Sequence, residues 1–214
     1  MNVDLMCHHG NDLLVVNAAR TSFDKQSDKL DEKDIKLINF LAREGHWLPF
    51  RHPQVTLRIY APIFVFRQLD KHQVGFSTSE ISRRYVTNSI HCFEPDTFRV
   101  RPENIKQGSV EPENPEWWWD QENRGLYVDA VFLAIDSYNK LLDNGVAPEQ
   151  ARAVLPQAMY TTQVKTGSLL GWGHLVKLRT EDHAQKEIKD LAVMIEETIS
   201  NLYPVSWKAI REYM

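Results

Sequence analysis

The sequence predicts a mixed, helix-rich fold with a small sheet. Apolar residues recur at helical spacing over several long segments, whereas alternation of apolar and polar residues is confined to short stretches. The chain has 214 residues, enough for one domain with a real hydrophobic core and a little short for two. Its composition, with 43% hydrophobic and 25% charged residues, is ordinary for a globular protein. We therefore expect a single domain over residues 1–214.

Two helices are predicted in the first part of the chain. Asn11 is a candidate N-cap for a short helix that ends near residues 22–24. Asp31 and Asp34 resemble a capping pair at the start of the second helix. Apolar residues at helical spacing continue from there to Gly45, a natural C-cap.

A strand and a third helix are predicted next. Apolar and polar residues alternate over residues 55–60, VTLRIY, which is typical of a half-buried strand. Pro62 then opens a helix over residues 63–72, IFVFRQLDKH, with one apolar side. This helix leads directly into a polar run over residues 70–85, DKHQVGFSTSEISRRY.

The second half of the chain starts with a long irregular segment. Residues 93–116 are rich in Pro, Glu and Asn, which predicts mainly loop with a short strand at residues 97–100, TFRV. A long amphipathic helix follows and ends at Asn144-Gly145. The remaining predicted elements are a short helix from Pro148 to Pro156, a strand or extended piece over residues 161–166, a helix around residues 168–178 and a last helix from near Asp182 to Pro204.

Charge, cysteine content and the N-terminus exclude several classes of protein. The net charge of −4 argues against general nucleic-acid binding, which usually shows a basic excess. Cys7 and Cys92 are the only cysteines, so no disulfide framework is implied and a reducing compartment is expected. The N-terminus has no basic start followed by an apolar core, and no apolar run approaches a membrane span. We therefore expect a cytoplasmic protein without nucleic-acid or membrane partners.

The polar run over residues 70–85 is a candidate anion site. Its glycine and hydroxyl side chains can turn donors toward phosphate oxygens, and Lys71, Arg83 and Arg84 supply countercharge. Glu80 is an acceptor suited to a ribose hydroxyl or a ring N–H. The run matches no formal phosphate-loop motif, so a solvated loop remains the alternative.

Histidines and arginines outside this run have more than one interpretation. His46 and His52 flank a turn, but no further ligands complete a set around them, so no metal site is predicted. Each of these two histidines could instead lie against a ligand ring, or be a hydrogen-bonded and partly buried residue without a ligand. Arg152 either covers apolar surface with its stem or reaches a ligand. Arg179 either interacts with a helix C-terminus or stabilises negative charge on a substrate carbonyl.

Two conspicuous features have ordinary interpretations. The three tryptophans at residues 117–119 are expected to pack on a neighbouring surface or subunit. Cys92 has only His91 beside it in the sequence, and a nucleophile needs a base and a lowered pKa. Cys92 is therefore expected to be a small packed residue.

Five segments together resemble the flavin-dependent thymidylate synthase family, in the family's order and over nearly the whole chain. They are NDLLVVNAARTSF, INFLAREGHWLPFRHPQVTLRIYAPIFVFRQLDKH, SEISRRY, GVAPEQARAVLPQAMYT and LVKLRTEDHAQKEI. The resemblance implies an α+β fold, helix-rich around a small, mainly antiparallel sheet, and a homotetramer with active sites at subunit contacts. It also implies reductive methylation of dUMP at C5 to dTMP, with FAD as cofactor and methylene-tetrahydrofolate and NADPH as co-substrates. That reaction needs no cysteine nucleophile.

The resemblance also implies roles for residues at matching positions. Arg179 matches the arginine that favours ionisation of the uracil ring, and His46 matches a histidine near the flavin and the folate; both are expected in catalysis. Arg152 matches an arginine that reaches the nucleotide from another subunit. The implied dUMP-binding residues are Gln68, Glu80, Ser82, Arg83, Arg84, Arg152 and Arg179. The implied FAD-contacting residues are Ser22, Leu48, Lys71, His72, Gln73, Glu80, Ser168 and His174.

The sequence departs from the family pattern on the flavin side. The family's signature is Arg-His-Arg, whereas this chain has Lys71-His72-Gln73. Ser168 and His174 also stand where asparagines are common in the family. Lysine keeps a point charge without the planar fork of arginine, and glutamine keeps hydrogen bonding only. Losing one charged contact weakens binding by on the order of 1.5–3 kcal/mol unless another residue compensates.

Three hypotheses follow from this asymmetry. The first is a working synthase whose altered flavin contacts are compensated by Ser77, Thr78 or Lys165. The second is a relative that makes another C5 product, such as hydroxymethyl-dUMP or a modified dCMP. The third is a nucleotide-binding homologue without turnover.

Overall fold

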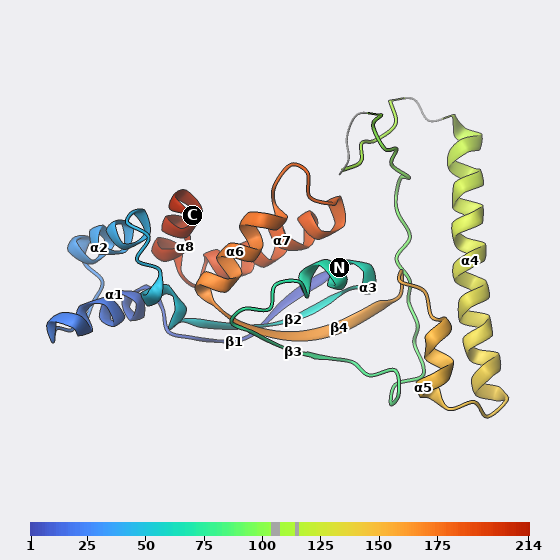
Figure 1. Ribbon diagram of the computed structural model, residues 1–214, viewed down its shortest axis with the longest axis horizontal. Coiled ribbons are helices and arrows are strands. Elements are labelled where there is room, and N and C mark those ends of the chain that lie inside the picture. Colours follow the sequence, from blue (N-terminus) through green and yellow to red (C-terminus); the bar gives the residue numbers. More distant parts are fainter. Residues whose placement is uncertain (104–107, 114–115) are drawn as a thin grey trace. The chain divides into compact units, whose positions relative to one another are not determined.

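The computed structural model describes residues 1–103, 108–113 and 116–214 (Figure 1). Its elements, with η for 3-10 helices, are β1 Asn2–His9, α1 Asp12–Arg20, η1 Thr21–Phe23, α2 Glu32–Arg43, η2 Leu48–Arg51, β2 Gln54–Pro62, α3 Ile63–Leu69, β3 Phe76–Glu80, α4 Trp117–Asp143, α5 Pro148–Ala151, η3 Arg152–Val154, β4 Tyr160–Ser168, α6 Leu169–Arg179, α7 Lys186–Ser200 and α8 Pro204–Tyr213. One four-stranded antiparallel sheet has the order β1-β2-β4-β3. The predicted α+β fold, helix-rich around a small antiparallel sheet, is therefore confirmed.

The chain divides into two compact units that interleave along the sequence. Unit 1 comprises Met1–Ile59, Gln68–Ser79 and Gln163–Met214. Unit 2 comprises Tyr60–Arg67 and Glu80–Thr162. Strands β2, β3 and β4 each contribute residues to both units. The single domain over residues 1–214 stays a prediction.

The core of unit 1 lies between the sheet and the C-terminal helices. Val55, Leu57 and Ile59 of β2 are fully buried, which confirms the alternation predicted for this strand. Helices α6 and α7 lie on one face of the sheet (Figure 1). The indole N–H of Trp172 in α6 donates to the carbonyl of Val55 at 3.2 Å, so this buried polar group is satisfied. The alternation thus turns one face of β2 toward the helices.

Local signals set the ends of the first two helices. Asn11 is the N-cap of α1, and its side chain accepts from the backbone N–H of Leu13 at 3.1 Å. Asp31 and Asp34 form a reciprocal capping box at the start of α2. Gly45 follows the end of α2 with a φ of +71°, a conformation that favours glycine. These predicted boundaries are confirmed.

Two elements at the ends of the chain were not predicted. Strand β1 leaves most of its side chains exposed, so its sequence lacks the apolar alternation that marks a half-buried strand. The last predicted helix was stopped at Pro204, but this proline instead opens α8. The Asp12 carboxylate accepts from the backbone N–H groups of Val205 at 3.1 Å and Ser206 at 2.8 Å. A residue from the other end of the chain therefore caps α8.

The last long helix, α7, also begins at Lys186 rather than near Asp182.

The polar run contains a strand where a turn or loop was expected. Helix α3 ends at Leu69, three residues before the predicted end, and β3 spans Phe76–Glu80. The Phe76 ring packs edge-on against Trp172, with centroids 4.9 Å apart. A Cβ at Gly167 of β4 would come within 2.2 Å of this ring. The strand is thus formed by packing against distant residues, which its own polar sequence does not reveal.

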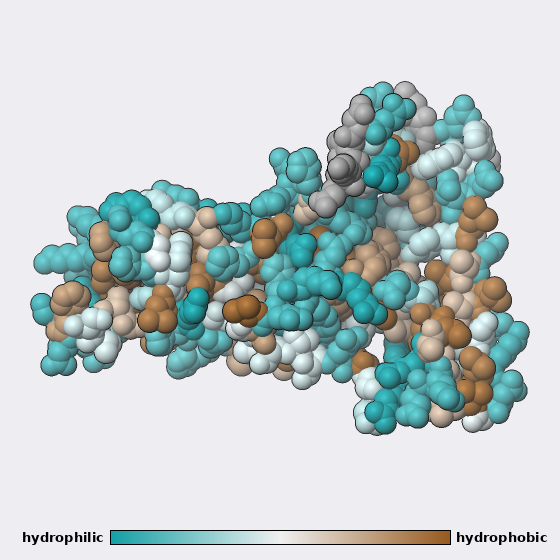
Figure 2. All heavy atoms as spheres, viewed as in Figure 1, coloured by the Kyte–Doolittle hydropathy of each residue, from teal (hydrophilic) through white to brown (hydrophobic). Residues whose placement is uncertain are grey.

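The middle of unit 2 is mostly irregular before one long helix. The short strand predicted at residues 97–100 is reduced to a single bridge between Val100 and Val110, and residues 104–107 and 114–115 of the predicted loop lie outside the described part. Helix α4 confirms the long predicted helix, and brown apolar side chains lie among teal ones along it (Figure 2). Phe132 is 70% exposed and Leu126 66%. Its predicted apolar stripe is covered unevenly, because Tyr138 is fully buried whereas Val128 and Phe132 are exposed. None of the described helices is long and apolar enough to cross a membrane.

Candidate active site

Most of the predicted site residues line one of three pockets, whereas Gln68, Arg84 and Arg179 line none of them. The η2 pocket, of about 770 Å³, lies in unit 1 between α1, α2 and η2. The His72 pocket, of about 370 Å³, lies in unit 1 between the turn that follows α3 and helix α6. The Arg152 pocket, of about 650 Å³, lies in unit 2.

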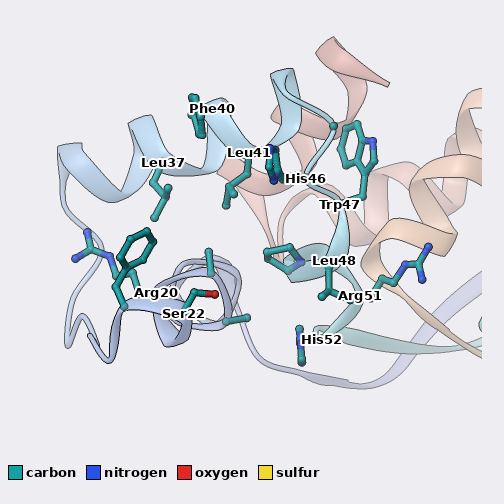
Figure 3. A pocket seen from close by; sticks show the side chains of 15 residues that line it. Arg20, Ser22, Leu37, Phe40, Leu41, His46, Trp47, Leu48, Arg51 and His52 are labelled. Atoms are coloured by element: carbon teal, nitrogen blue, oxygen red, sulfur yellow. The ribbon is translucent and has the colours of Figure 1, made fainter.

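The η2 pocket has apolar and aromatic walls. Ser22, His46 and Leu48 line it, and their side chains are shown in Figure 3. The His46 ring stacks on Phe40, with centroids 6.3 Å apart and planes 23° apart. Leu48 is 68% exposed at the pocket wall. Exposed flat and apolar side chains of this kind can pack against a planar ring.

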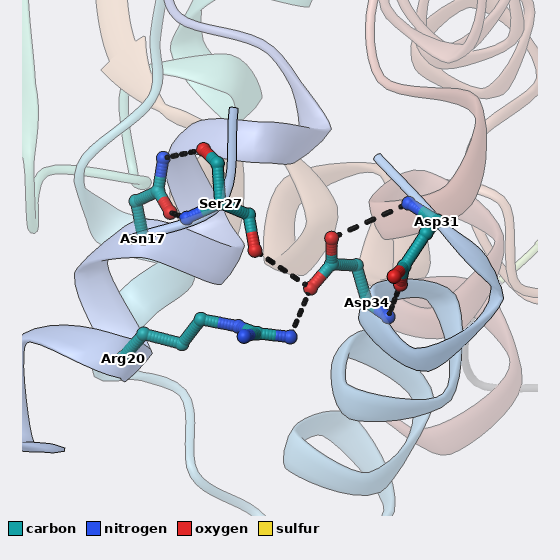
Figure 4. A network of polar contacts seen from close by, with 5 residues as sticks. All are labelled: Asn17, Arg20, Ser27, Asp31 and Asp34. Atoms are coloured by element: carbon teal, nitrogen blue, oxygen red, sulfur yellow. Dashed lines mark hydrogen bonds and ion pairs between the residues drawn. The ribbon is translucent and has the colours of Figure 1, made fainter. Parts of the chain in front are cut away.

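A polar network holds one wall of the η2 pocket (Figure 4). Arg20, which lines this pocket, forms an ion pair with Asp34, and Ser27 Oγ donates to the same carboxylate at 3.1 Å. Asn17 Nδ2 donates to the Ser27 carbonyl at 3.0 Å, and its Oδ1 accepts from the Ser27 N–H at 2.8 Å. Asp34 is only 1% exposed and also accepts from the backbone N–H of Asp31 at 3.3 Å, so its charge is compensated by protein donors. The network fixes the segment that presents Ser22.

The His72 pocket brings together five of the predicted flavin-contacting residues. They are Lys71, His72, Gln73, Ser168 and His174. Arg51 also lines this pocket and lines the η2 pocket as well, so it is the residue common to both. No role was predicted for Arg51 from the sequence. The eighth predicted flavin residue, Glu80, lines the Arg152 pocket instead.

Arg179 is held by two acceptors at the end of α6. Its Nε donates to Nε2 of His72 at 3.0 Å, and one terminal nitrogen donates to the Gln68 carbonyl at 3.0 Å. Because Nε2 of His72 accepts, the neutral ring has its proton on Nδ1. Burial, reinforced by the charge of Arg179, lowers the pKa of His72 to about 4. His72 is therefore neutral near pH 7. It orients the guanidinium by accepting a hydrogen bond, and it adds no second positive charge beside it.

Lys165 is a buried cation beneath the turn. Its side chain is 2% exposed, and Nζ donates to Asp70 at 2.9 Å and to Oγ1 of Thr78 at 2.8 Å. The ammonium also lies 5.5 Å from the centre of the Phe76 ring. Lys165 and Thr78 were expected to compensate for the altered flavin contacts, but these bonds commit both of them to the protein. Ser77 remains exposed.

The Arg152 pocket collects the predicted nucleotide-binding residues of unit 2. Glu80, Ser82, Arg83 and Arg152 line it, and so does Arg67, an exposed cation that was not predicted as a site residue from the sequence. Its position next to Gln68 in α3 was the one available signal.

Two arginines of this region are engaged with the protein itself. Arg83 donates from one terminal nitrogen to the Asn88 carbonyl at 2.7 Å, so it braces its own loop. Arg84 is not among the residues that line the Arg152 pocket; it lies 3.6 Å from Glu149 and over the Tyr85 ring. Of the seven predicted dUMP-binding residues, Gln68 and Arg179 belong to unit 1 and the rest to unit 2.

Cysteine and metal chemistry find little support in the described residues. Burial raises the pKa of Cys92, which disfavours its thiolate, and its backbone forms a bridge with Met159. Over residues 1–103, 108–113 and 116–214, no group of three or more histidine, cysteine or acidic side chains is placed to hold a metal ion.

The neutral state of His72 makes stability depend on pH. Above its unfolded pKa of 6.5, His72 is neutral whether the protein is folded or not. Between pH 6.5 and about 4, the unfolded chain takes up a proton that the folded protein does not. The free energy of unfolding should therefore fall as the pH is lowered through this window. The fall should be on the order of 1–2 kcal/mol once partial solvent screening is allowed for. Urea unfolding at several pH values measures this fall. The His72→Gln variant should lack this component, and an identical pH profile for both proteins would refute the assignment.

The comparisons with known proteins extend over nearly the whole chain. The family model described as thymidylate synthase complementing protein matches residues 4–205. A flavin-dependent thymidylate synthase of Thermus thermophilus is 34% identical over 212 residues, which are 99% of this chain and 76% of that protein. A synthase of the same name from Kosmotoga olearia is 33% identical over 204 residues, 95% of this chain and 87% of its own.

A solved structure agrees with the fold. The UMP/dUMP methylase PolB from Streptomyces cacaoi, bound with 5-Br UMP, is 30% identical and has a TM-score of 0.87, covering 99% of this chain and 94% of that one. With 5-Br dUMP bound, PolB has a TM-score of 0.83 at the same identity, covering 99% and 95%. The resemblance found in the five sequence segments is thus confirmed, and this chain belongs to the flavin-dependent thymidylate synthase family.

Proposed function

We propose that this enzyme methylates dUMP at C5 to form dTMP, with FAD as cofactor, methylene-tetrahydrofolate as carbon donor and NADPH as reductant. Family membership makes it a methyltransferase that uses this cofactor and these co-substrates. The observation that best supports the dUMP reaction is the fixed guanidinium of Arg179. We also propose that the enzyme works in the cytoplasm as a homotetramer.

Arg179 supplies the electrostatic part of the reaction. His72 and the Gln68 carbonyl hold its guanidinium through Nε and one terminal nitrogen. The other terminal nitrogen remains to donate to a carbonyl of the uracil ring. A fixed cation there favours the ionised ring, in which C5 is more nucleophilic.

The donors of the His72 pocket fit a flavin dinucleotide. Arg51 and Lys71 bring two cations, and Gln73 and Ser168 bring neutral donors, a set suited to a diphosphate. Burial lowers the pKa of His174, so its imidazole adds neutral polar groups. The aromatic and apolar wall of the η2 pocket, with His46, suits the planar ring system. When bound, the flavin would supply the redox chemistry, and these residues would hold it in place.

Exposed apolar side chains on α4 support the proposed homotetramer. Trp118, Leu126, Phe132 and Leu133 are between 56% and 70% exposed. Large exposed apolar side chains on one helix are typical of an interaction surface. The tetramer would also allow Arg152 to reach the nucleotide of a neighbouring subunit.

UMP is a second candidate substrate, because PolB is described as a UMP/dUMP methylase. The altered Lys71-His72-Gln73 triplet further motivates a different C5 product, such as hydroxymethyl-dUMP or a modified dCMP.

One assay separates these possibilities. Purified protein is incubated with FAD, methylene-tetrahydrofolate and NADPH, and with dUMP, UMP or dCMP in separate reactions. Mass spectrometry of each product should show a methyl gain on dUMP. A hydroxymethyl gain, or turnover only with UMP or dCMP, would replace the proposed reaction with one of the alternatives. Protein that stays colourless with added FAD would contradict flavin chemistry altogether and leave a nucleotide-binding homologue.

A further inference from the structure

The signature segment Lys71-His72-Gln73 of the His72 pocket has fewer positive charges than the family's Arg-His-Arg, and no other residue of this segment replaces the missing charge. Of the triplet, only Lys71 is a cation, because His72 is neutral and its Nε2 is engaged by Arg179, while Gln73 has no charge. Lys165 is buried against Asp70. A dinucleotide with two negatively charged phosphate groups therefore needs a cation from another element.

Arg51 is that cation on geometric grounds. It is the last residue of η2, and it lines both the η2 pocket and the His72 pocket. Its neighbours Pro49 and Phe50 are buried, which anchors the backbone that presents it. In Figure 3 its guanidinium points away from Arg20 and Ser22, on the opposite side of the pocket.

The side chain of Arg51 is not committed to the protein. Within residues 1–103, 108–113 and 116–214, its guanidinium forms no ion pair or hydrogen bond, while its backbone carbonyl accepts a 2.8 Å bond from Gln54 Nε2. This contrasts with Arg20 and Arg179, whose guanidinium groups both have protein partners. After burial and Lys177, the charge of Arg51 is a further cause of the lowered pKa of His174, so Arg51 lies within electrostatic reach of α6.

We propose that Arg51 is the arginine that binds the FAD diphosphate in this chain and replaces, from η2, the charge that Gln73 lacks. The inference rests on the proposed use of FAD. A guanidinium can donate two parallel hydrogen bonds to a phosphate, which neither Lys71 nor Gln73 can do in the same way. Because Arg51 lines both pockets, it lies where a ligand with its ring in one pocket and its phosphates in the other would pass.

The test measures flavin affinity without turnover. FAD and riboflavin, which lacks phosphate, are titrated into wild-type protein and into Arg51→Gln, with flavin fluorescence as the readout. We expect FAD to bind about 10- to 100-fold more weakly to Arg51→Gln, and riboflavin to bind equally to both. The dependence of FAD affinity on salt should also become shallower, because one charged contact is lost.

A control and a rescue variant sharpen the result. Arg58→Gln removes an exposed arginine of the same unit that lines none of the three pockets, and it should leave FAD affinity unchanged. Adding Gln73→Arg to Arg51→Gln should restore much of the FAD affinity, because an arginine at position 73 places a positive charge in the same pocket. Thermal unfolding of every variant confirms that it is folded.

The possible contrary results are distinct. Unchanged FAD affinity in Arg51→Gln would overturn the inference while leaving the proposed function intact. Equal weakening of FAD and riboflavin would place Arg51 at the ring or in the fold, and would also overturn it. Unchanged FAD affinity with weaker binding of NADPH or the folate would assign Arg51 to another anion. Wild-type protein that binds no FAD would reject the proposed function first.

Discussion

Replacing Arg179 with alanine is expected to lower turnover by roughly 10²–10³-fold while FAD remains bound. The guanidinium is positioned before any substrate arrives, by Nε2 of His72 and the Gln68 carbonyl, each 3.0 Å away. A charge held in this way needs no reorganisation when negative charge grows on the uracil ring. Single-turnover formation of dTMP measures the loss, and the visible absorbance of the flavin shows whether the cofactor is still bound.

Two further variants define what the arginine contributes. Arg179→Lys keeps a charge but cannot satisfy both acceptors and the uracil ring with the same geometry, so it should fall between wild type and alanine. Arg43→Ala removes an exposed arginine of α2 in the same unit and should be as active as wild type. Turnover by Arg179→Ala at the wild-type rate would refute the assigned role.

Replacing Asp70 with asparagine is expected to be more destabilising than removing its buried partner. Lys165 is 2% exposed, whereas Asp70 is 42% exposed, so the two ends of this ion pair are unequal. Asp70→Asn leaves an ammonium buried without its counter-ion, which costs about 3 kcal/mol of unfolding free energy. Lys165→Met removes the buried charge and leaves a carboxylate that water can reach. Its cost should be within about 1.5 kcal/mol.

Urea unfolding of both single variants and the double variant measures this difference. The double variant should resemble Lys165→Met, because no unpaired buried charge remains. Gln163 Nε2 also donates to Asp70, at 2.9 Å and on the other carboxylate oxygen, so Asp70→Asn removes one acceptor together with the charge. A larger loss for Lys165→Met than for Asp70→Asn would contradict this account of the pair.

The altered flavin signature is understood differently once distant contacts are known. From the sequence, Lys165 and Thr78 were reasonable candidates to compensate for the missing arginine charge. In the structure, Lys165 Nζ donates to Oγ1 of Thr78 and to the carboxylate of Asp70. Arg51 comes from a segment where no basic motif drew attention, yet it lines the same pocket as Gln73. The positive charge that a pocket can offer to a ligand depends on which of its cations are already paired within the protein. The sequence alone does not show which cations are paired.

The same limit applies to two arginines of the polar run. Arg83 and Arg84 both match nucleotide-binding positions, so the same role was predicted for both from the sequence. In the structure, Arg83 donates to the Asn88 carbonyl at 2.7 Å, while Arg84 lies near Glu149. The roles of all the predicted site residues stay predictions. Which of them line a pocket and which do not could not have been derived from spacing along the chain.

The sequence by itself determined the features that depend on neighbouring residues. Caps at Asn11 and Asp31, the glycine stop at Gly45 and the alternation along β2 all arise within a few residues, where hydrogen bonds and burial follow local pattern. The family was also determined there, because five motifs occur in order. Only the tertiary structure decided the rest. Strand β3 depends on packing of Phe76 against Trp172, and α8 is capped by Asp12 from the other end of the chain. The Lys165–Asp70 pair likewise joins residues 95 positions apart. These contacts form because folding brings distant groups together, and no local pattern specifies which ones meet.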